Sequence, residues 1–132
     1  MNATTSSSTV TDLKWGLEVT KLGFQIVPDA IFKYQAVLGR DENGSTQAVS
    51  SPELVVLLNV LMHWWTRETI AFPSPQAIAT RIGIDRRSVD RAVDGLVKKM
   101  ILKKDRVGGV VIYDPSPLVE RLQQLVVEQT KK

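Results

Sequence analysis

The amino-acid sequence predicts a mainly α-helical domain with one small β-hairpin. Four times along the chain, a hydroxyl or carboxylate residue that can cap a helix precedes apolar residues at helical spacing. Two short β-branched runs flank Gly108-Gly109, a dipeptide that accommodates the positive φ angles of a two-residue hairpin turn. With 132 residues, 43% of them hydrophobic, the chain has the length and composition of one domain with its own core.

Composition excludes several classes of function. The chain has no cysteine and one histidine, His63, so disulfides and sulfur-based zinc sites are excluded and imidazole chemistry is improbable. The longest nearly apolar stretch, residues 54–65, is shorter than the roughly 20 residues that cross a bilayer. Residues 1–10 are polar, without the basic and apolar regions of a secretory signal, and we expect a disordered tail. No catalytic motif is present, so we expect a cytoplasmic protein that is not an enzyme and has no cofactor, metal or membrane partner.

The N-terminal third predicts two short helices. Residues 11–22 carry apolar side chains at helical spacing and end at Gly23, and residues 24–27 look extended. A second helix is predicted from Pro28 to about Leu38, with Gly39 as its C-terminal cap. Residues 39–50 are polar, contain two glycines and have no periodicity, which indicates a surface loop or mobile insertion.

A central buried helix is predicted over residues 51–65. Ser51 is the expected cap, Pro52 suits the first helical position, and Glu53 lies near the positive end of the helix dipole. Apolar side chains cover most of the circumference of this helix, which is typical of a helix buried on several sides.

Two consecutive helices joined by a glycine turn follow. Ser74 precedes a short helix over residues 75–82, which Gly83 ends, and Asp85 caps a longer helix over residues 86–99. The second helix has the clearest periodicity in the chain. Its apolar stripe consists of Val89, Ala92, Val93, Leu96, Val97 and Met100.

A β-hairpin over residues 101–114 and a last helix over residues 116–132 complete the chain. The strands are 101–107 and 110–113, and Ser116 with Pro117 starts the helix. Residues 11–115 form the predicted domain, and the last helix is a candidate dimerisation element or protein-docking element. Its apolar seam is Leu118, Leu122, Leu125 and Val126; packing of this seam on the same domain is the alternative.

This order of elements is that of a winged helix-turn-helix with extra N-terminal and C-terminal helices. Ala79 allows close crossing of the first helix, Gly83 permits a left-handed turn, and Val89 anchors the second helix. The segment FPSPQAIATRIGIDRRSVDRAVDGLVKKMIL resembles the bacterial winged helix-turn-helix family, and the resemblance extends over residues 23–107. It implies DNA binding, because similar proteins include transcription regulators and the DNA-binding modules of plasmid and phage replication initiators, many carried on mobile elements. Met100 departs from the family, in which glycine is common at this position.

Charge is concentrated in the same segment. Residues 81–106 hold nine basic and four acidic residues, a local charge of 9 − 4 = +5, whereas the whole chain carries +3. At 100° per residue, Arg87 and Arg91 point away from the apolar stripe. Asp90 and Asp94 could pair with Arg91 and Lys98 and neutralise part of this face. A basic face of this kind is typical of a protein that binds a polyanion.

The motif assigns roles to individual residues. The N-terminal part of the second helix meets base edges in the major groove, which nominates Arg87, Ser88 and Arg91, since arginine can bond O6 and N7 of guanine together. Strand alternation places Lys104 and Arg106 on one face of the wing and Lys103 on the other, and we favour the first pair. The predicted phosphate contacts are Ser74 and Gln76 on the first helix, Arg86 and Lys98 on the second, and Lys104 and Arg106 on the wing, which follows the backbone or enters the minor groove.

The sequence therefore favours a sequence-specific double-stranded DNA-binding protein, a transcription regulator that acts as a homodimer on adjacent half-sites. One alternative is a replication or partition protein of a plasmid or phage that uses the same DNA face. The other is a winged-helix module that docks a protein partner through the wing or the C-terminal helix.

Overall fold

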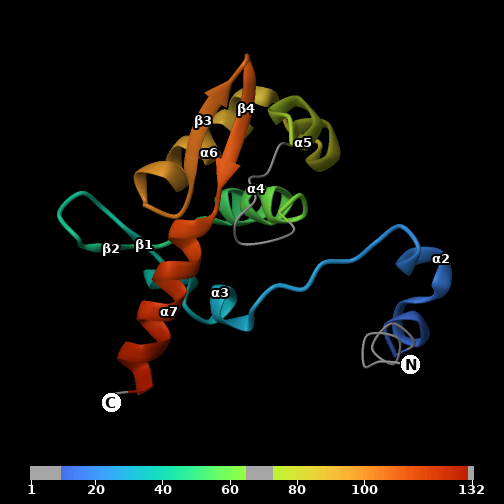
Figure 1. The fold of residues 1–132 in the computed structure, drawn as a ribbon, viewed down its shortest axis with the longest axis horizontal. Helices are drawn as coiled ribbons and strands as arrows, with labels where there is room; N and C mark the ends of the chain where they lie inside the picture. Colours follow the sequence, from blue (N-terminus) through green and yellow to red (C-terminus); the bar gives the residue numbers. More distant parts are fainter. Residues whose placement is uncertain (1–9, 65–72, 131–132) are drawn as a thin grey trace.

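The structure, a computed structural model, describes residues 10–64 and 73–130. The described elements are α2 (Leu17–Thr20), α3 (Asp29–Lys33), the 3-10 helix η1 (Gln35–Val37), β1 (Gly39–Arg40), β2 (Thr46–Gln47), α4 (Ser51–Leu61), α5 (Pro75–Ile82), α6 (Arg86–Lys98), β3 (Lys103–Val107), β4 (Val110–Asp114) and α7 (Ser116–Thr130) (Figure 1). The predicted mainly α fold with a β-hairpin and flanking helices is confirmed. None of the described helices is both long enough and apolar enough to cross a bilayer.

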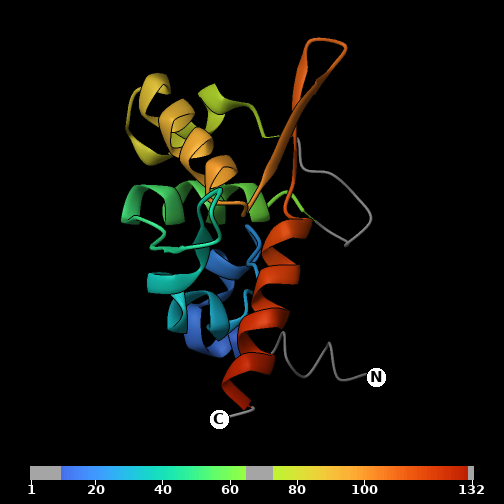
Figure 2. The ribbon, with the colours of Figure 1, turned by 90° about the vertical axis from the view of Figure 1, so that its left-hand side faces the viewer.

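Helix α4 lies in the middle of the molecule. Helices α5 and α6 and the β3–β4 hairpin lie on one side of it, and α3 and α7 lie on the other (Figures 1 and 2). Helix α6 contacts both α4 and α5, and the side chains of Val56, Leu57 and Val60 from α4 and of Val89 and Leu96 from α6 are fully buried. The expectation of a central buried helix is therefore confirmed for α4, within the part of it that the structure describes.

The helix-turn-helix forms as the sequence predicts. The hydroxyl of Ser74 accepts a hydrogen bond from the amide of Ala77 at 3.0 Å, which satisfies one of the unpaired amides at the start of α5. Gly83 ends α5 with a φ of 82°, in the left-handed region that glycine adopts without a Cβ clash. Asp85 then caps α6 by accepting a hydrogen bond from the amide of Ser88 at 3.3 Å.

Helix α6 ends in a left-handed residue that is not glycine. Met100 has a φ of 62°, the amide of Ile101 donates to the carbonyl of Leu96 at 3.0 Å, and the amide of Met100 donates to the carbonyl of Val97 at 3.1 Å. This pair of bonds is the Schellman arrangement. Methionine therefore occupies the position after the helix at which glycine is favoured.

The β3–β4 hairpin forms with the predicted two-residue turn. Gly108 and Gly109 have φ angles of 56° and 81°, as the favoured hairpin turns require. Strand β4 continues one residue beyond the prediction, to Asp114. Val111 and Tyr113 are buried, so one face of the hairpin packs on the domain and its tip projects away from it (Figure 2).

The N-terminal segment departs from the prediction of one helix over residues 11–22. Residues 10–15 and 17–20 are helical, but Gly16 interrupts them with a φ of 90°. The hydroxyl of Thr20 donates to the carboxylate of Asp12 across this break. The second predicted helix is shorter than expected, because α3 ends at Lys33 and is followed by the 3-10 helix η1.

Residues 39–47 form a short hairpin, a regular element that the prediction of a surface loop or mobile insertion did not include. Strands β1 and β2 pair antiparallel, and the carboxylate of Asp41 accepts hydrogen bonds from the amides of Asn43 and Ser45, each at 2.9 Å. Gly39 is not a helix cap: it lies in β1, where an added Cβ would stand 2.8 Å from the Cβ of Lys99. A close contact with a residue 60 positions away cannot be inferred from local periodicity.

Helix α4 starts with a capping box built on Ser50 and not on Ser51. The hydroxyl of Ser50 accepts from the amide of Glu53 at 3.3 Å, and the carboxylate of Glu53 accepts from the amide of Ser50 at 2.8 Å. A capping box needs the acid three residues after the cap, and only Ser50 satisfies that spacing. The helix ends at Leu61 and residues 62–64 are not helical, so it is shorter than the predicted 51–65; residue 65 itself lies outside the described residues.

Helix α7 packs on its own domain. Leu118, Leu122 and Leu125 are buried in the core of the same chain, whereas Val126 is 41% exposed. The guanidinium of Arg121 is buried as well and donates to the carbonyls of Leu38 and Val37 at 3.0 and 2.8 Å. Three of the four residues of the predicted dimer seam therefore pack within one chain. For these three, the alternative prediction, packing on the same domain, is correct.

The left-handed position of Met100 predicts that Met100→Gly stabilises the protein. Relief of the Cβ clash outweighs the added flexibility of the unfolded chain, so we expect a gain of about 0.5–1 kcal/mol in the free energy of unfolding. Urea denaturation measures this quantity. Met100→Ala is the matched control, because it removes the same side chain beyond Cβ and keeps the clash. A glycine variant no more stable than the alanine variant would contradict this account of the helix end.

Candidate nucleic-acid interface

Helix α6 has one buried face and one exposed basic face. Val89, Val93 and Leu96 are at most 1% exposed, whereas Arg87, Arg91 and Lys98 are exposed. The orientation that the helical periodicity predicts is therefore confirmed. One side of α6 is fixed in the core, and the basic side is accessible to a partner.

The acidic residues of α6 leave Arg87 and Arg91 unpaired. Asp90 lies 3.8 Å from Arg86, and Asp94 lies 4.0 Å from Lys104 on β3, so the expectation that these acids pair with Arg91 and Lys98 is wrong. Because the pair with Lys104 joins residues on different elements, it could not be foreseen from helical spacing. Within residues 10–64 and 73–130, neither Arg87 nor Arg91 makes a hydrogen bond or ion pair.

The first turn of α6 is organised by its cap. The hydroxyl of Ser88 donates to the carboxylate of Asp85. This hydrogen bond, the largest contribution, and the bond from the Ser88 amide lower the pKa of Asp85 below its ordinary value. Ser88 therefore has its hydroxyl committed to the cap, while the neighbouring Arg87 extends into solvent.

The wing places Lys104 and Arg106 on one face. Lys104 lies opposite Tyr113, and Arg106 lies opposite Val111; directly opposed residues of an antiparallel pair share a face. This is the face that packs towards α6, as the approach of Lys104 to Asp94 shows. Lys103 lies opposite Asp114 on the other face, as strand alternation predicts.

The start of α5 is accessible. Ser74 and Gln76 are exposed, although both side chains already have partners: the Ser74 hydroxyl accepts from Ala77, and the Gln76 amide donates to the Thr80 hydroxyl at 3.4 Å. The amides of the first turn of a helix attract anions. No group of three or more histidine, aspartate and glutamate side chains in the described part of the chain is arranged to hold a metal ion.

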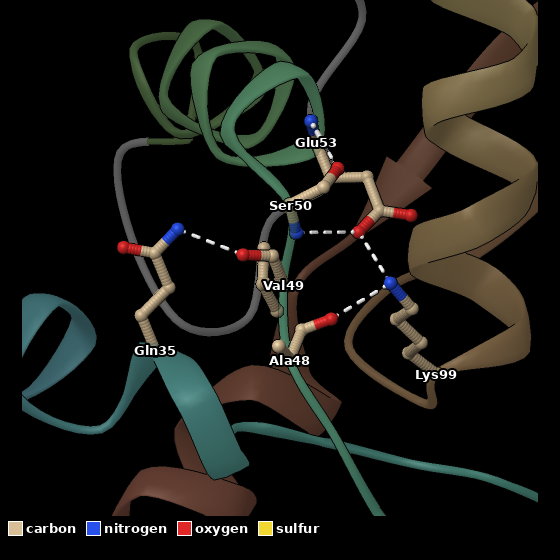
Figure 3. Close-up of polar contacts among 6 residues, drawn as sticks. All are labelled: Gln35, Ala48, Val49, Ser50, Glu53 and Lys99. Atoms are coloured by element: carbon tan, nitrogen blue, oxygen red, sulfur yellow. Dashed lines mark hydrogen bonds and ion pairs between the residues drawn. The ribbon is translucent and has the colours of Figure 1, made fainter.

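A partly buried ion pair holds the C-terminal end of α6 in place. The ammonium of Lys99 lies 2.6 Å from the carboxylate of Glu53 and donates to the carbonyl of Ala48 at 2.8 Å (Figure 3). The same carboxylate oxygen accepts from the amide of Ser50 at 2.8 Å. The carboxylate oxygen and the ammonium thus together connect the cap of α4, the residue Ala48 that precedes it and the end of α6.

The hairpin β1–β2 is fixed to the same point. The amide of Arg40 donates to the carbonyl of Lys99 at 3.0 Å. The amide side chain of Gln35 donates to the carbonyl of Val49 at 2.7 Å, next to Ala48 (Figure 3). Lys99, which the sequence predicted only as the last residue of this helix, is therefore the meeting point of three elements.

The ion pair controls the ionisation of Glu53. Burial, the largest single effect, raises the pKa of Glu53, but the hydrogen bonds from Lys99 and Ser50 and the charge of Lys99 together lower it below its ordinary value of 4.5. A carboxylate with a lowered pKa in the folded state stabilises that state above the pKa of the unfolded chain. Its contribution is lost as the pH falls below that value through the folded pKa.

The position of the Glu53 carboxylate explains why residue 95 is a glycine. A Cβ built on Gly95 would stand 2.0 Å from the second carboxylate oxygen of Glu53 and 3.1 Å from its carboxyl carbon. The carboxylate is held by Lys99 and Ser50, so it cannot swing aside without breaking those bonds. The sequence showed only the lower helix propensity of glycine, and neither the ion pair nor the role of Gly95 could be found from spacing.

This contact predicts that Gly95→Ala destabilises the protein although alanine is the better helix former. The helical gain is about 1 kcal/mol, and we expect the displaced ion pair to cost more than that, with a net loss of about 1–3 kcal/mol. Urea denaturation of the full chain measures the change.

The matched control is the same substitution in a Glu53→Ala background. The carboxylate is then absent, so Gly95→Ala should stabilise that background by about 1 kcal/mol. Equal effects of Gly95→Ala in both backgrounds would show that the carboxylate does not restrict position 95.

Comparisons with known proteins assign no family to this chain. No family model matches it, and no curated protein matches it. Two solved structures of Lactococcus lactis ZitR, a single-mutant and a double-mutant form, are similar at 17% and 16% identity. Each comparison covers 98% of this chain and 78% of that chain, with TM-scores of 0.38 and 0.39. The winged helix-turn-helix architecture of this chain rests on its own elements, α5, α6 and the β3–β4 hairpin.

Proposed function

We propose that this chain is a sequence-specific double-stranded DNA-binding protein that reads the major groove with α6. The observation that carries the proposal is the pair Arg87 and Arg91, exposed and unpaired within the described residues, on a helix whose opposite face is buried in the core. Arginine carries a planar fork of donors that bonds two acceptors of guanine at once. A rigid helix directs both forks to the same side.

The spacing of the two arginines fits a base-reading role. Arg87 and Arg91 are four residues apart on one helix, which separates them by roughly 6 Å along its axis. Successive base pairs of a duplex lie about 3.4 Å apart, so the two side chains would reach bases about two steps apart. Ser88 lies between them; because its hydroxyl donates to Asp85, it would contribute to base reading only as an acceptor.

The wing and the starts of both helices supply phosphate contacts in this proposal. Lys104 and Arg106 share the wing face that packs towards α6, and Ser74, Gln76 and Arg86 lie at the N-terminal ends of α5 and α6. Lys98 lies at the far end of α6, where it would meet the backbone instead of the groove floor. Phosphate contacts set the orientation of the protein and carry no sequence information directly.

We infer a regulatory role in transcription and two copies per site. A single small module buries limited DNA surface, and two copies that read adjacent half-sites supply the missing affinity. A replication or partition protein would use the same face on repeated sites. Selection of bound duplexes from a genomic library separates the two: sites upstream of genes support regulation, and clustered repeats at one locus support replication or partition.

Substitution of the two arginines tests base recognition. Arg87→Ala or Arg91→Ala should weaken binding to the selected duplex by about 1–3 kcal/mol and relax preference at one base pair each, measured by mobility-shift titration. Arg91→Lys keeps the charge and loses the fork, so it should lose preference while retaining affinity for unrelated DNA. Lys33→Ala on α3 removes the same charge from the opposite side of α4 and should have no effect on preference. Unchanged binding by both alanine variants would mean that α6 is not the reading helix.

Substitution on the wing tests the phosphate contact. Lys104→Ala should weaken binding to all duplexes by a similar factor and reduce the slope of log affinity against log salt concentration by about 1. Lys103→Ala, on the other wing face, is the matched control and should leave the slope nearly unchanged. A slope that falls only in the Lys103 variant would show that the wing presents its other face to DNA.

A further inference from the structure

The N-terminal arm, defined as residues 10–26, exposes an unusual amount of apolar surface. Eight of its seventeen residues are large and apolar, and each has between 55% and 91% of its surface exposed. These residues are Val10, Leu13, Trp15, Leu17, Val19, Leu22, Phe24 and Ile26. Soluble monomers rarely expose contiguous apolar patches of more than a few hundred Å². A segment of this composition needs a partner that covers it.

The arm is a preformed element that projects from the domain, and near its C-terminal end the side-chain amide of Gln25 donates to the carbonyl of Leu58 on α4 at 3.3 Å. Its helical stretches, 10–15 and 17–20, are tied together by the hydrogen bond from Thr20 to Asp12. None of its described apolar side chains belongs to the core cluster or packs against it. Residues 23–28 have no helix or strand and can span roughly 20 Å, and Figure 1 shows the arm projecting away from α3, α4 and α7.

We propose that the arm is the dimerisation element and that its occupant is a second copy of this chain. The exposed apolar side chains of one arm amount to on the order of 1,000 Å², so the pairing of two arms removes an area typical of a stable homodimer. A two-fold pairing covers the same patch in both copies with no other partner. The inference rests on the proposed function only in that two joined copies suit adjacent half-sites.

The charge of the arm favours a second copy over other occupants. Two basic residues, Lys14 and Lys21, balance two acidic residues, Asp12 and Glu18, so two arms do not repel each other. A helix that lies on an anionic membrane surface is rich in basic residues on its polar face, and a nucleic-acid contact needs net positive charge. The arm meets neither requirement.

As a dimer contact, α7 offers less exposed apolar surface than the arm, because most of its apolar residues are buried in the core. Leu118, Leu122 and Leu125 are already buried within one chain, and only Val126 and Val127 of that helix stay exposed among its apolar residues. Two valines offer much less area than eight large side chains. Dimerisation through the arm also leaves α6 and the wing uncovered, because the arm lies far from both (Figures 1 and 2).

The mass of the full chain in solution, without DNA, tests the proposal. Sedimentation equilibrium at micromolar concentration should give twice 14.7 kDa. The variant Leu13→Gln/Leu22→Gln/Ile26→Gln should raise the dimer dissociation constant on the order of a hundredfold or more, since three apolar anchors are lost. These side chains are among the most exposed in the arm, so the far-ultraviolet spectrum and the melting temperature of the monomer should be unchanged.

The matched control is Val126→Gln/Val127→Gln, which polarises the exposed apolar residues of α7 and should leave the dimer intact. A single-copy mass for the wild-type chain would overturn the proposal, as would a dimer that survives the triple substitution. A dimer lost only in the α7 variant would move the interface to α7. Affinity for an isolated half-site duplex depends on α5, α6 and the wing of one copy and not on the arm, so it should persist in the triple variant. Its absence from the wild type would count against DNA binding and not against the dimer.

Discussion

The packing of α6 against α4 determines which side of α6 is available to a partner. Its apolar stripe is buried in the core from Val89 to Leu96, whereas Val97 and Met100 at its end are exposed. The close approach at Gly95 is possible only because that residue has no side chain. The carboxylate of Glu53 occupies the space and is neutralised by Lys99. A buried carboxylate without a cation would be strongly unfavourable, so the position of α6 and the pairing of Glu53 depend on each other.

The surrounding elements make this position rigid. The same ammonium reaches the carbonyl of Ala48, between β2 and α4, and the carbonyl of Lys99 accepts from the amide of Arg40 in β1. Arg121 of α7 holds the carbonyls of Val37 and Leu38, which precede β1. The C-terminal end of α6 is therefore fixed by contacts from three directions, while its N-terminal half carries the exposed arginines. Rigid placement matters for recognition, because a side chain that is already oriented loses less entropy when it binds.

Local patterns in the sequence were sufficient for the helix-turn-helix and the wing. The stripe of α6, the caps Ser74 and Asp85 and the Gly108-Gly109 turn are all set by neighbours in the chain. The β1–β2 hairpin was missed because its strands have two residues each and no periodicity. The Glu53–Lys99 pair spans 46 residues, and an amphipathic stripe such as that of α7 does not show what will cover it. The orientation of the candidate DNA face was thus predictable, but the contacts that fix it were not.

A nuclear magnetic resonance titration with duplex DNA tests the central claim most directly, because it reports which surface of the whole chain the duplex touches. The account predicts that the backbone amide shifts change most over residues 85–91 of α6 and over the wing, and least over α3 and the N-terminal arm. Changes confined to the arm or α7, or none at duplex excess, would contradict the claim that the basic side of α6 is the face that meets DNA.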